Sequence, residues 1–241
     1  MGENRFSRTI DKRIRITYVM LTHKIQFYGR RKGRKLSNNK NNLINLVGPK
    51  VFINKEFIIK KINNLSGKKY LEIGFGSGEN LIKFAQKHPN SNFIGAEPYI
   101  NSYVKVLKNI IENKSKNIKI FPDDIRLVIN YFKHSFFDSV FLLHPDPWQK
   151  YKHKKRRILQ QSFINSLSKV LKKNGLIIIA TDQPVMKSWV LEQFHIREDF
   201  EWKINHTKET FKKPKFFLET KYSKKTLGTN NLVNWFFFKK K

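Results

Sequence analysis

The chain has 241 residues, 39% apolar and 14% aromatic, enough for one full core, so we expect one domain with extensions. Its 49 Lys and Arg against 18 Asp and Glu give a net charge of +31, which favours a polyanionic partner, with nucleic acid as the first candidate. The absence of cysteine excludes a disulfide framework and a zinc-thiolate site, and the absence of a long apolar run argues against a membrane span.

Positive charge dominates residues 1–50. Before position 41 this segment holds 12 Lys or Arg, against only Glu3 and Asp11, and the charge is densest at 28–35. The start of the chain lacks the apolar stretch of a secretion signal, so a cytoplasmic location is expected. We predict an irregular, flexible basic arm over 1–50 and a single domain over 51–241.

From Lys68 onward, short apolar runs alternate with helix-length segments. This alternation is typical of an α/β fold with a mostly parallel sheet. The predicted strands cover residues 69–73, 92–97, 117–121, 137–143 and 175–181, and the predicted helices cover 79–87, 101–113, 124–133, 156–172 and 185–195. Two aromatic segments, 200–202 and 232–238, are expected to add antiparallel strands at an edge.

One acidic residue stands at or just beyond the carboxyl end of each predicted parallel strand. These residues are Glu72, Glu97, Asp124, Asp146 and Asp182. In an open α/β sheet the ligand crevice lies outside those ends, so we expect the five carboxylates to meet at one cavity. Any single one could be an ordinary helix N-cap or turn former, but that explanation weakens when all five strands share the feature.

The loop after the first predicted strand carries glycine at alternate positions, Gly74, Gly76 and Gly78. Glycine permits a tight turn and lets a ligand approach the backbone. The spacing is G-x-G-x-G, which differs from the G-x-G-x-x-G that seats a pyrophosphate. Glu72 beside this loop would repel a phosphate but could bind an ammonium group. The loop therefore favours a cationic amino-acid ligand over a dinucleotide.

The acids at the next two strand ends suit further groups of the same ligand. Glu97 follows the loop by about 20 residues, where a carboxylate can accept both hydroxyls of a ribose. Asp124 could accept the amino group of an adenine, and Asp123 is the alternative. Acceptors for a ribose and an adenine, together with a site for an amino acid, describe S-adenosylmethionine, which we predict as the cofactor.

The fourth strand leads into the loop His144–Trp148, His-Pro-Asp-Pro-Trp. Two prolines fix its backbone, so the carboxylate of Asp146 is held without a large ordering cost when a substrate arrives. Trp148 offers a face on which a base could stack, an interaction worth ~1–3 kcal/mol per base. The alternative is a rigid loop with a core tryptophan.

Residues 150–157 carry six fixed positive charges directly after this loop. A charge run is usually only a solvated face. This one adjoins the predicted cleft, interleaves Tyr151 and His153, and precedes a helix whose start would ordinarily favour acids. We therefore predict a phosphate-binding surface.

Four segments together carry a resemblance to a known family. They are Leu71–Gly78, Pro145–Trp148 with the basic run after it, Ala180–Asp182, and Thr220–Tyr222. Over roughly residues 27–238 the sequence resembles the bacterial tRNA (guanine-N7-)-methyltransferase family, whose members modify guanine 46 in the tRNA variable loop. The resemblance implies a Rossmann-like class I methyltransferase fold with an antiparallel edge strand, S-adenosylmethionine as cofactor and tRNA as partner, with no metal required.

The resemblance also implies roles for single residues. It assigns cofactor binding to Glu72, Glu97 and Asp124, cofactor or guanine binding at the catalytic centre to Asp146, and substrate contacts to Lys150, Asp182, Thr220, Lys221, Tyr222 and Ser223. Ser223 stands where the family usually has Glu, and His144 where it usually has an aromatic residue. Ser223 accepts a hydrogen bond but carries no charge, so weaker guanine recognition, or recognition through Glu219, is expected there.

The chemistry follows from the nucleophile. Guanine N7 has a free lone pair at neutral pH, so no proton must leave and positioning should dominate. Asp146 could orient the base and stabilise its developing positive charge, and Asp182 could accept from N1 or the exocyclic amine. Two alternatives stay open: an exocyclic-amine methyltransferase, which uses a related Asp-Pro-Pro-aromatic loop, and a non-catalytic RNA-binding protein on the same fold. A monomer and a homodimer are both compatible with the sequence.

Overall fold

The computed structural model describes residues 25–204 and 232–241. The strands are β1 Lys69–Ile73, β2 Asn92–Ala96, β3 Ile118–Phe121, β4 Phe137–Leu143, β5 Leu171–Thr181, β6 Phe200–Trp202 and β7 Asn234–Lys240. The α-helices are α2 Asn38–Val51, α3 Lys55–Lys60, α4 Glu79–Lys87, α5 Ile100–Glu112, α6 Gln161–Val170 and α7 Pro184–His195. The short 3₁₀ helices are η1 Ile62–Asn64, η2 Ile125–Leu127, η3 Ile129–Tyr131 and η4 Tyr151–Arg156.

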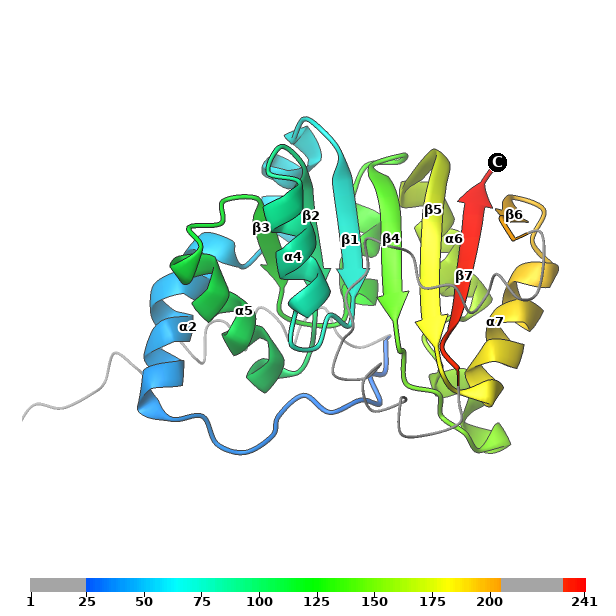
Figure 1. Ribbon diagram of the computed structural model, residues 1–241, viewed down its shortest axis with the longest axis horizontal. Helices are drawn as coiled ribbons and strands as arrows, with labels where there is room; N and C mark the ends of the chain where they lie inside the picture. Colours follow the sequence, from blue (N-terminus) through cyan, green and yellow to red (C-terminus); the bar gives the residue numbers. More distant parts are fainter. Residues whose placement is uncertain (1–24, 205–231) are drawn as a thin grey trace, which may run out of the picture.

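The strands form a seven-stranded sheet in the order β3-β2-β1-β4-β5-β7-β6. The strands β1 to β5 pair in parallel, whereas β7 runs antiparallel to both β5 and β6 (Figure 1). The predicted α/β class, with a mostly parallel sheet and antiparallel strands at one edge, is confirmed. The arrowheads of β1, β2, β3 and β4 all point to the same edge of the sheet, where a ligand crevice is expected.

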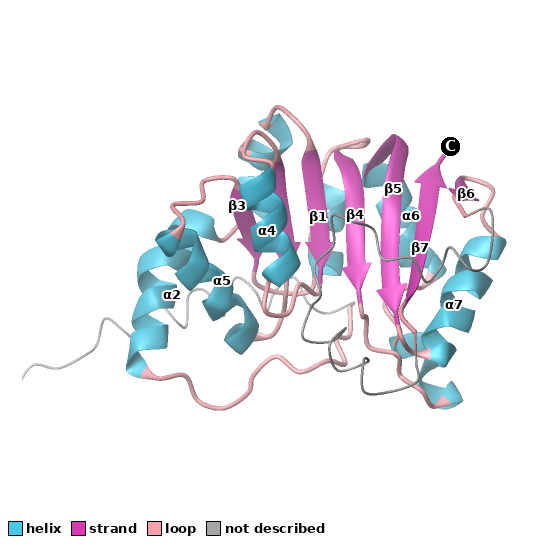
Figure 2. Ribbon diagram, viewed as in Figure 1, coloured by secondary structure: helices cyan, strands magenta, loops and turns pink. Residues whose placement is uncertain are grey.

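Helices cover both faces of this sheet (Figure 2). On one face α2, α4 and α5 pack against a buried cluster that includes Phe84 and Leu107. On the other face α6 and α7 pack against a second cluster that includes Ile164 and Val190. Burial of both faces explains why the central strands are apolar nearly throughout. None of the helices in the described ranges combines the length and hydropathy that a membrane span requires.

The expectation of an irregular segment is wrong for the last part of residues 1–50. Residues 38–51 form α2, whose Val47 and Val51 are buried in the cluster that contains Tyr103 of α5. These two valines recur at helical spacing, so packing against α5 stabilises a helix despite the charge of the segment. Residues 1–24 lie outside the described ranges, and the division into arm and domain stays a prediction.

Two predicted helices differ from the observed ones. Residues 124–133 form the two short helices η2 and η3, because Asp124 caps a single turn and Val128 leaves helical geometry with φ −131°. The predicted helix 156–172 begins only at Gln161, because Arg156 ends the separate helix η4 and Arg157 follows that helix in an extended conformation. At the C-terminal side, Leu171 already pairs with Phe137, so β5 starts earlier than the predicted 175.

Candidate active site

A cavity of about 410 Å³ opens at the carboxyl ends of β1, β2, β3 and β4. The predicted site residues on its wall are Gly74, Gly76, Glu97, Asp124 and Asp146. The predicted residues that lie outside the wall are Glu72, Gly78, Lys150 and Asp182. The structure therefore brings three of the five strand-end acids to one cavity. Their ligand-binding roles stay predictions.

The glycine loop after β1 needs its glycines for two different reasons. Gly74, Gly76 and Gly78 have φ values of 71°, 54° and 73°, in the left-handed region that favours glycine. A Cβ on Gly74 would meet no atom within 4 Å, so its backbone faces open space. A Cβ on Gly78 would lie 2.2 Å from Cγ2 of Val106, so this glycine lets the start of α4 pack closely on α5.

Glu72, at position four of β1, is 4% exposed. Its Oε2 atom has no hydrogen-bond partner among the described residues. Burial, and secondarily the charge of Glu97, raises the pKa of the Glu72 carboxyl to about 8. The raised pKa means that this buried carboxyl keeps its proton at neutral pH, and the cofactor-binding role of Glu72 stays a prediction.

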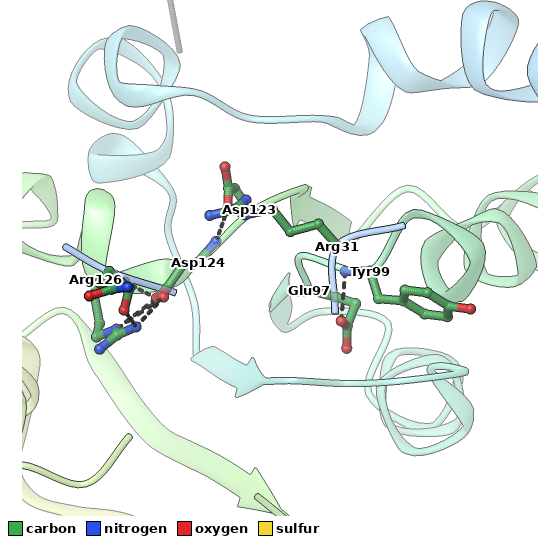
Figure 3. Close-up of polar contacts among 7 residues, drawn as sticks. Arg31, Glu97, Tyr99, Asp123, Asp124 and Arg126 are labelled. Atoms are coloured by element: carbon green, nitrogen blue, oxygen red, sulfur yellow. Dashed lines mark hydrogen bonds and ion pairs between the residues drawn. The ribbon is translucent and has the colours of Figure 1, made fainter. Parts of the chain in front are cut away.

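Glu97 ties the loops after β1 and β2 together. Its Oε2 accepts a hydrogen bond from the backbone N–H of Gly76 at 2.9 Å. Its Oε1 accepts one from the N–H of Tyr99 at 2.9 Å, and Figure 3 shows this second contact. Burial raises the pKa of this carboxyl, and the two backbone donors act in the opposite direction. Glu97 is therefore held in place before any ligand binds.

Two arginines bind the acids that follow β3, and the sequence analysis missed both (Figure 3). Asp124 accepts from Arg126 through Nε at 3.0 Å and Nη2 at 2.6 Å, and Asp123 forms an ion pair with Arg31. The Asp-x-Arg spacing could have indicated the first pair, whereas nothing local marks the second, because Arg31 lies 92 residues away. Oδ1 of Asp124 also accepts from the backbone N–H of Arg126 at 3.0 Å and from its Nε at 3.1 Å, so Arg126 occupies both oxygens and an adenine amino group would share or replace one of these contacts.

Arg31 belongs to an irregular segment, residues 26–34, that we call the strap and that runs past the carboxyl ends of the strands in Figure 1. The backbone N–H of Ile100 donates to the carbonyl of Arg31 at 3.1 Å, and the Asn101 side chain bonds the backbone of Gly33 and Arg34 at 3.3 and 3.2 Å. These contacts fasten the strap to the start of α5. Four strap residues, 27–30, form part of the cavity wall.

The strap also contacts the loop after β4. The Tyr28 ring meets the Trp148 ring edge-on with centroids 6.2 Å apart. The Arg156 guanidinium lies 4.9 Å from the Tyr28 centroid and 5.0 Å from that of Trp148. Two aromatic rings and a cation thus gather at one side of the cavity, a combination that suits base stacking and cation–π contact.

The loop His144–Trp148 is held in a strained form. Its first and last residues, His144 and Trp148, have φ values of 52° and 43°, which side chains with a Cβ rarely adopt. Arg157, 4% exposed, donates through Nε to the carbonyl of Pro147 at 3.0 Å and through Nη2 to that of Trp148 at 3.2 Å. Backbone strain of this kind persists where surrounding contacts impose it, and it concentrates at functional sites.

Asp146 is the middle residue of this loop and the most exposed of the five strand-end acids. Its position on the cavity wall still removes part of its water, and this desolvation raises the pKa of its carboxyl. The carboxylate thus faces both the cavity and the solvent from which a large substrate would arrive.

Asp182, directly after β5, contacts His144, the first residue of the same loop. Its Oδ1 lies 3.3 Å from Nδ1 of His144, and its Oδ2 accepts from Nε2 of Gln183 at 3.0 Å. Burial lowers the pKa of the His144 imidazole, although the hydrogen bond and charge of Asp182 act against that shift. His144 itself lies on the cavity wall, so Asp182 borders the cavity through it.

The basic run after the loop forms η4 and its flanking residues. The predicted six-charge phosphate surface is wrong in one member, because Arg157 is buried against the Trp189 ring and holds the loop. The five remaining charges, on Lys150, Lys152, Lys154, Lys155 and Arg156, are exposed or half-buried. Lys150 directly precedes the helix and is exposed, and Trp148, two residues before it, lies on the cavity wall.

The predicted substrate residues Thr220, Lys221, Tyr222 and Ser223, and the alternative Glu219, lie outside the described residues. In the part of the chain that the structure describes, no group of three or more His, Cys, Asp or Glu side chains could hold a metal ion.

Comparison with known proteins adds the family. Residues 66–234 match a family model described as "Putative methyltransferase". A tRNA (guanine-N(7)-)-methyltransferase of Zymomonas mobilis is 31% identical over 88% of this chain and 92% of its own length. One of Bartonella quintana is 31% identical over 92% of this chain and 100% of its own length. A bifunctional methyltransferase of Rickettsia typhi is 34% identical over 86% of this chain but only 39% of its own length.

Solved structures agree on the fold. A 16S rRNA methyltransferase aligns with a TM-score of 0.53 and 12% identity over 78% of this chain and 93% of that chain. This likeness shows the class I methyltransferase fold alone. The family model covers well over half of the chain, and the two full-length relatives exceed 30% identity. The chain therefore belongs to the tRNA (guanine-N7-)-methyltransferase family.

Proposed function

We propose that this chain transfers the methyl group of S-adenosylmethionine to N7 of guanine in tRNA, at guanine 46 of the variable loop. The observation that carries the proposal is the place of Asp146, which lies on the cavity wall in a strained loop directly before the basic helix η4. One side of this loop faces a pocket of cofactor size, and the other faces a surface suited to a polyanion. Family membership supports guanine N7 as the acceptor.

The residues of the cavity fit S-adenosylmethionine. Glu72 lies behind the cavity wall, and an ammonium group that reached its unpartnered Oε2 would favour the charged carboxylate over the protonated form that burial favours. Gly74 leaves open space at its backbone, and Glu97 and Asp124 bring carboxylate acceptors to the same wall. When bound, S-adenosylmethionine supplies an electrophilic methyl group on a sulfonium. Gly76 completes the set that would hold it, and Gly78 supports the loop through its packing on α5.

The chain's own residues then act by positioning. Guanine N7 attacks with its free lone pair, so no side chain has to remove a proton. Asp146 orients the base and stabilises the positive charge that develops on the purine. Asp182 accepts from N1 and the exocyclic amine, and Trp148 stacks on the ring. This division needs neither a nucleophilic side chain nor a general base.

The tRNA backbone binds the positive surface around η4. Lys150, Lys152, Lys154 and Lys155 are exposed there, and no acidic residue interrupts the helix. Lysines on such a surface neutralise phosphates and release counterions, which supplies affinity independent of sequence. The same surface brings the nucleic acid to the side of the cavity where Asp146 lies.

A methylation assay on an unmodified tRNA transcript tests the proposal. We expect one methyl group per tRNA, at a guanine of the variable loop, and strand cleavage there after borohydride and alkali treatment, which marks N7-methylguanine. A methylated product without cleavage would overturn the N7 assignment in favour of an exocyclic amine. No product, together with no calorimetric binding of S-adenosylmethionine, would favour the non-catalytic RNA-binding alternative.

A further inference from the structure

His144 and Gln183 hold the two carboxylate oxygens of Asp182 from opposite sides. Nδ1 of His144 lies 3.3 Å from Oδ1, and Nε2 of Gln183 donates to Oδ2 at 3.0 Å. Gln183 is in turn contacted by Nε2 of Gln149, 3.4 Å from its Oε1. Asp182 is therefore restrained in rotation as well as in place.

The backbone of His144 is adapted to this contact. Its N–H donates to the carbonyl of Ala180 at 2.8 Å, which joins the end of β4 to the end of β5. Its φ of 52° lies in the left-handed region, where His and Asn occur more often than other residues with a Cβ. Burial lowers the pKa of the imidazole, and in the tautomer that carries its proton on Nδ1 the neutral ring donates to Oδ1 of Asp182.

A carboxylate restrained in this way presents two acceptors at a constant spacing. The Watson–Crick edge of guanine offers two donors side by side, N1–H and the exocyclic amine, whereas adenine has an acceptor at N1. A site built to pair both donors rejects an analogue that lacks one, because a buried acceptor is then left unpaired. The discrimination depends on how well the carboxylate is held.

We propose that His144, with Gln183, is a positioning residue that holds Asp182 as a two-acceptor reader of the guanine edge. This inference rests on the proposed function, because it presumes that a guanine lies beside Asp182. It adds a determinant of base specificity to the residues already assigned. His144 does not take part in methyl transfer itself.

Replacement of His144 offers a closely matched pair of variants. His144→Asn keeps a donor, because Nδ2 of Asn and Nδ1 of His are both bonded to Cγ, and Asn also tolerates the left-handed backbone. His144→Phe keeps a planar ring but removes the donor. Gln183→Leu removes the donor on the other oxygen at similar side-chain size.

The test compares two tRNA transcripts that carry guanine or inosine at the target position, since inosine lacks the exocyclic amine. We expect kcat/KM of the unchanged enzyme to favour guanine by on the order of 100-fold, as loss of one hydrogen bond to a charged group predicts. In His144→Phe and Gln183→Leu the ratio should fall at least fivefold, mostly through KM for guanine tRNA, and His144→Asn should restore it. Melting temperature and S-adenosylmethionine affinity serve as folding controls.

The outcomes separate this inference from the function on which it rests. If the unchanged enzyme methylates guanine tRNA but His144→Phe keeps the full preference over inosine, the positioning role is overturned. The same holds if kcat and the preference change alike in His144→Asn and His144→Phe. If the unchanged enzyme does not methylate guanine tRNA, the proposed function itself fails.

Discussion

The two sides of the cavity differ in how deeply their acidic side chains are buried and in whether the chain itself supplies hydrogen-bond donors to them. On the β1–β3 side, Glu72, Glu97 and Asp124 are 8% exposed or less, and the last two are already bonded within the chain. On the β4–β5 side, Asp146 is exposed and lies in a strained loop next to a basic helix. The first side suits a small ligand, because the chain already holds Glu97 and Asp124 in position before a ligand binds. The second side leaves room for a macromolecule to complete it.

The largest expected effect falls on the exposed side. Asp146→Ala should lower kcat on tRNA roughly 100-fold or more, the scale seen when one charge-stabilising group is removed from an active site. Affinity for tRNA, measured by filter binding, should stay within threefold, because phosphate contacts lie elsewhere. Turnover within threefold of the unchanged enzyme would remove Asp146 from the catalytic centre.

The next effect concerns the buried side. Glu97→Ala removes the acceptor of the Gly76 and Tyr99 N–H groups and one predicted ribose contact, so Kd for S-adenosylmethionine should rise at least about 10-fold. Calorimetry measures this directly. Glu201→Ala, an exposed acid on β6, serves as the control and should leave Kd unchanged. A rise in the Kd for tRNA of similar size would contradict the separation of the two sides.

A smaller effect is expected on salt dependence. Replacing Lys150, Lys152, Lys154 and Lys155 together by Ala should reduce the slope of log K for tRNA against log salt by about 3, since each lost phosphate contact removes roughly 0.7–0.9. The matched control replaces four lysines in and directly after α5, Lys105, Lys108, Lys114 and Lys116. Equal slopes in the two quadruple variants would show that η4 is not the tRNA surface.

The smallest effect is on stability. The pKa of Glu72 is raised from 4.5 to about 8 in the folded chain, so between these pH values the unfolded chain loses a proton that the folded chain keeps. The free energy of unfolding therefore falls as pH rises through this window. Glu72→Gln removes that dependence. The melting temperature of the variant minus that of the unchanged protein should therefore rise by on the order of 5 °C from pH 5 to pH 8. A constant difference across the window would contradict a protonated Glu72.

Much of this contrast was predictable from the sequence, because strand-end acids follow a general rule of parallel sheets. The rule located Glu97, Asp124 and Asp146, and the apolar periodicity predicted most elements. What could not be predicted depends on tertiary contact. Arg31 reaches Asp123 across 92 residues, and Arg157 looks in sequence like any other member of a basic run.

The strap is a second region whose structure depends on tertiary contacts and could not be predicted from the sequence. Residues 26–34 have no apolar periodicity and a high charge, so they read as a solvated arm. In the structure their order comes from partners outside the segment, namely Asn101, Asp123 and Trp148. No local pattern records such partners. The monomer or homodimer state and the cytoplasmic location also stay predictions.

A single-turnover methylation assay tests the separation of the two sides most directly. With enzyme in excess over tRNA and S-adenosylmethionine raised to saturation, Glu97→Ala should recover a rate constant within a few-fold of the unchanged enzyme, because its defect is in cofactor affinity. Asp146→Ala should stay roughly 100-fold slower at any cofactor concentration, because its defect is in the transfer itself. Recovery of both variants, or of neither, would contradict the account.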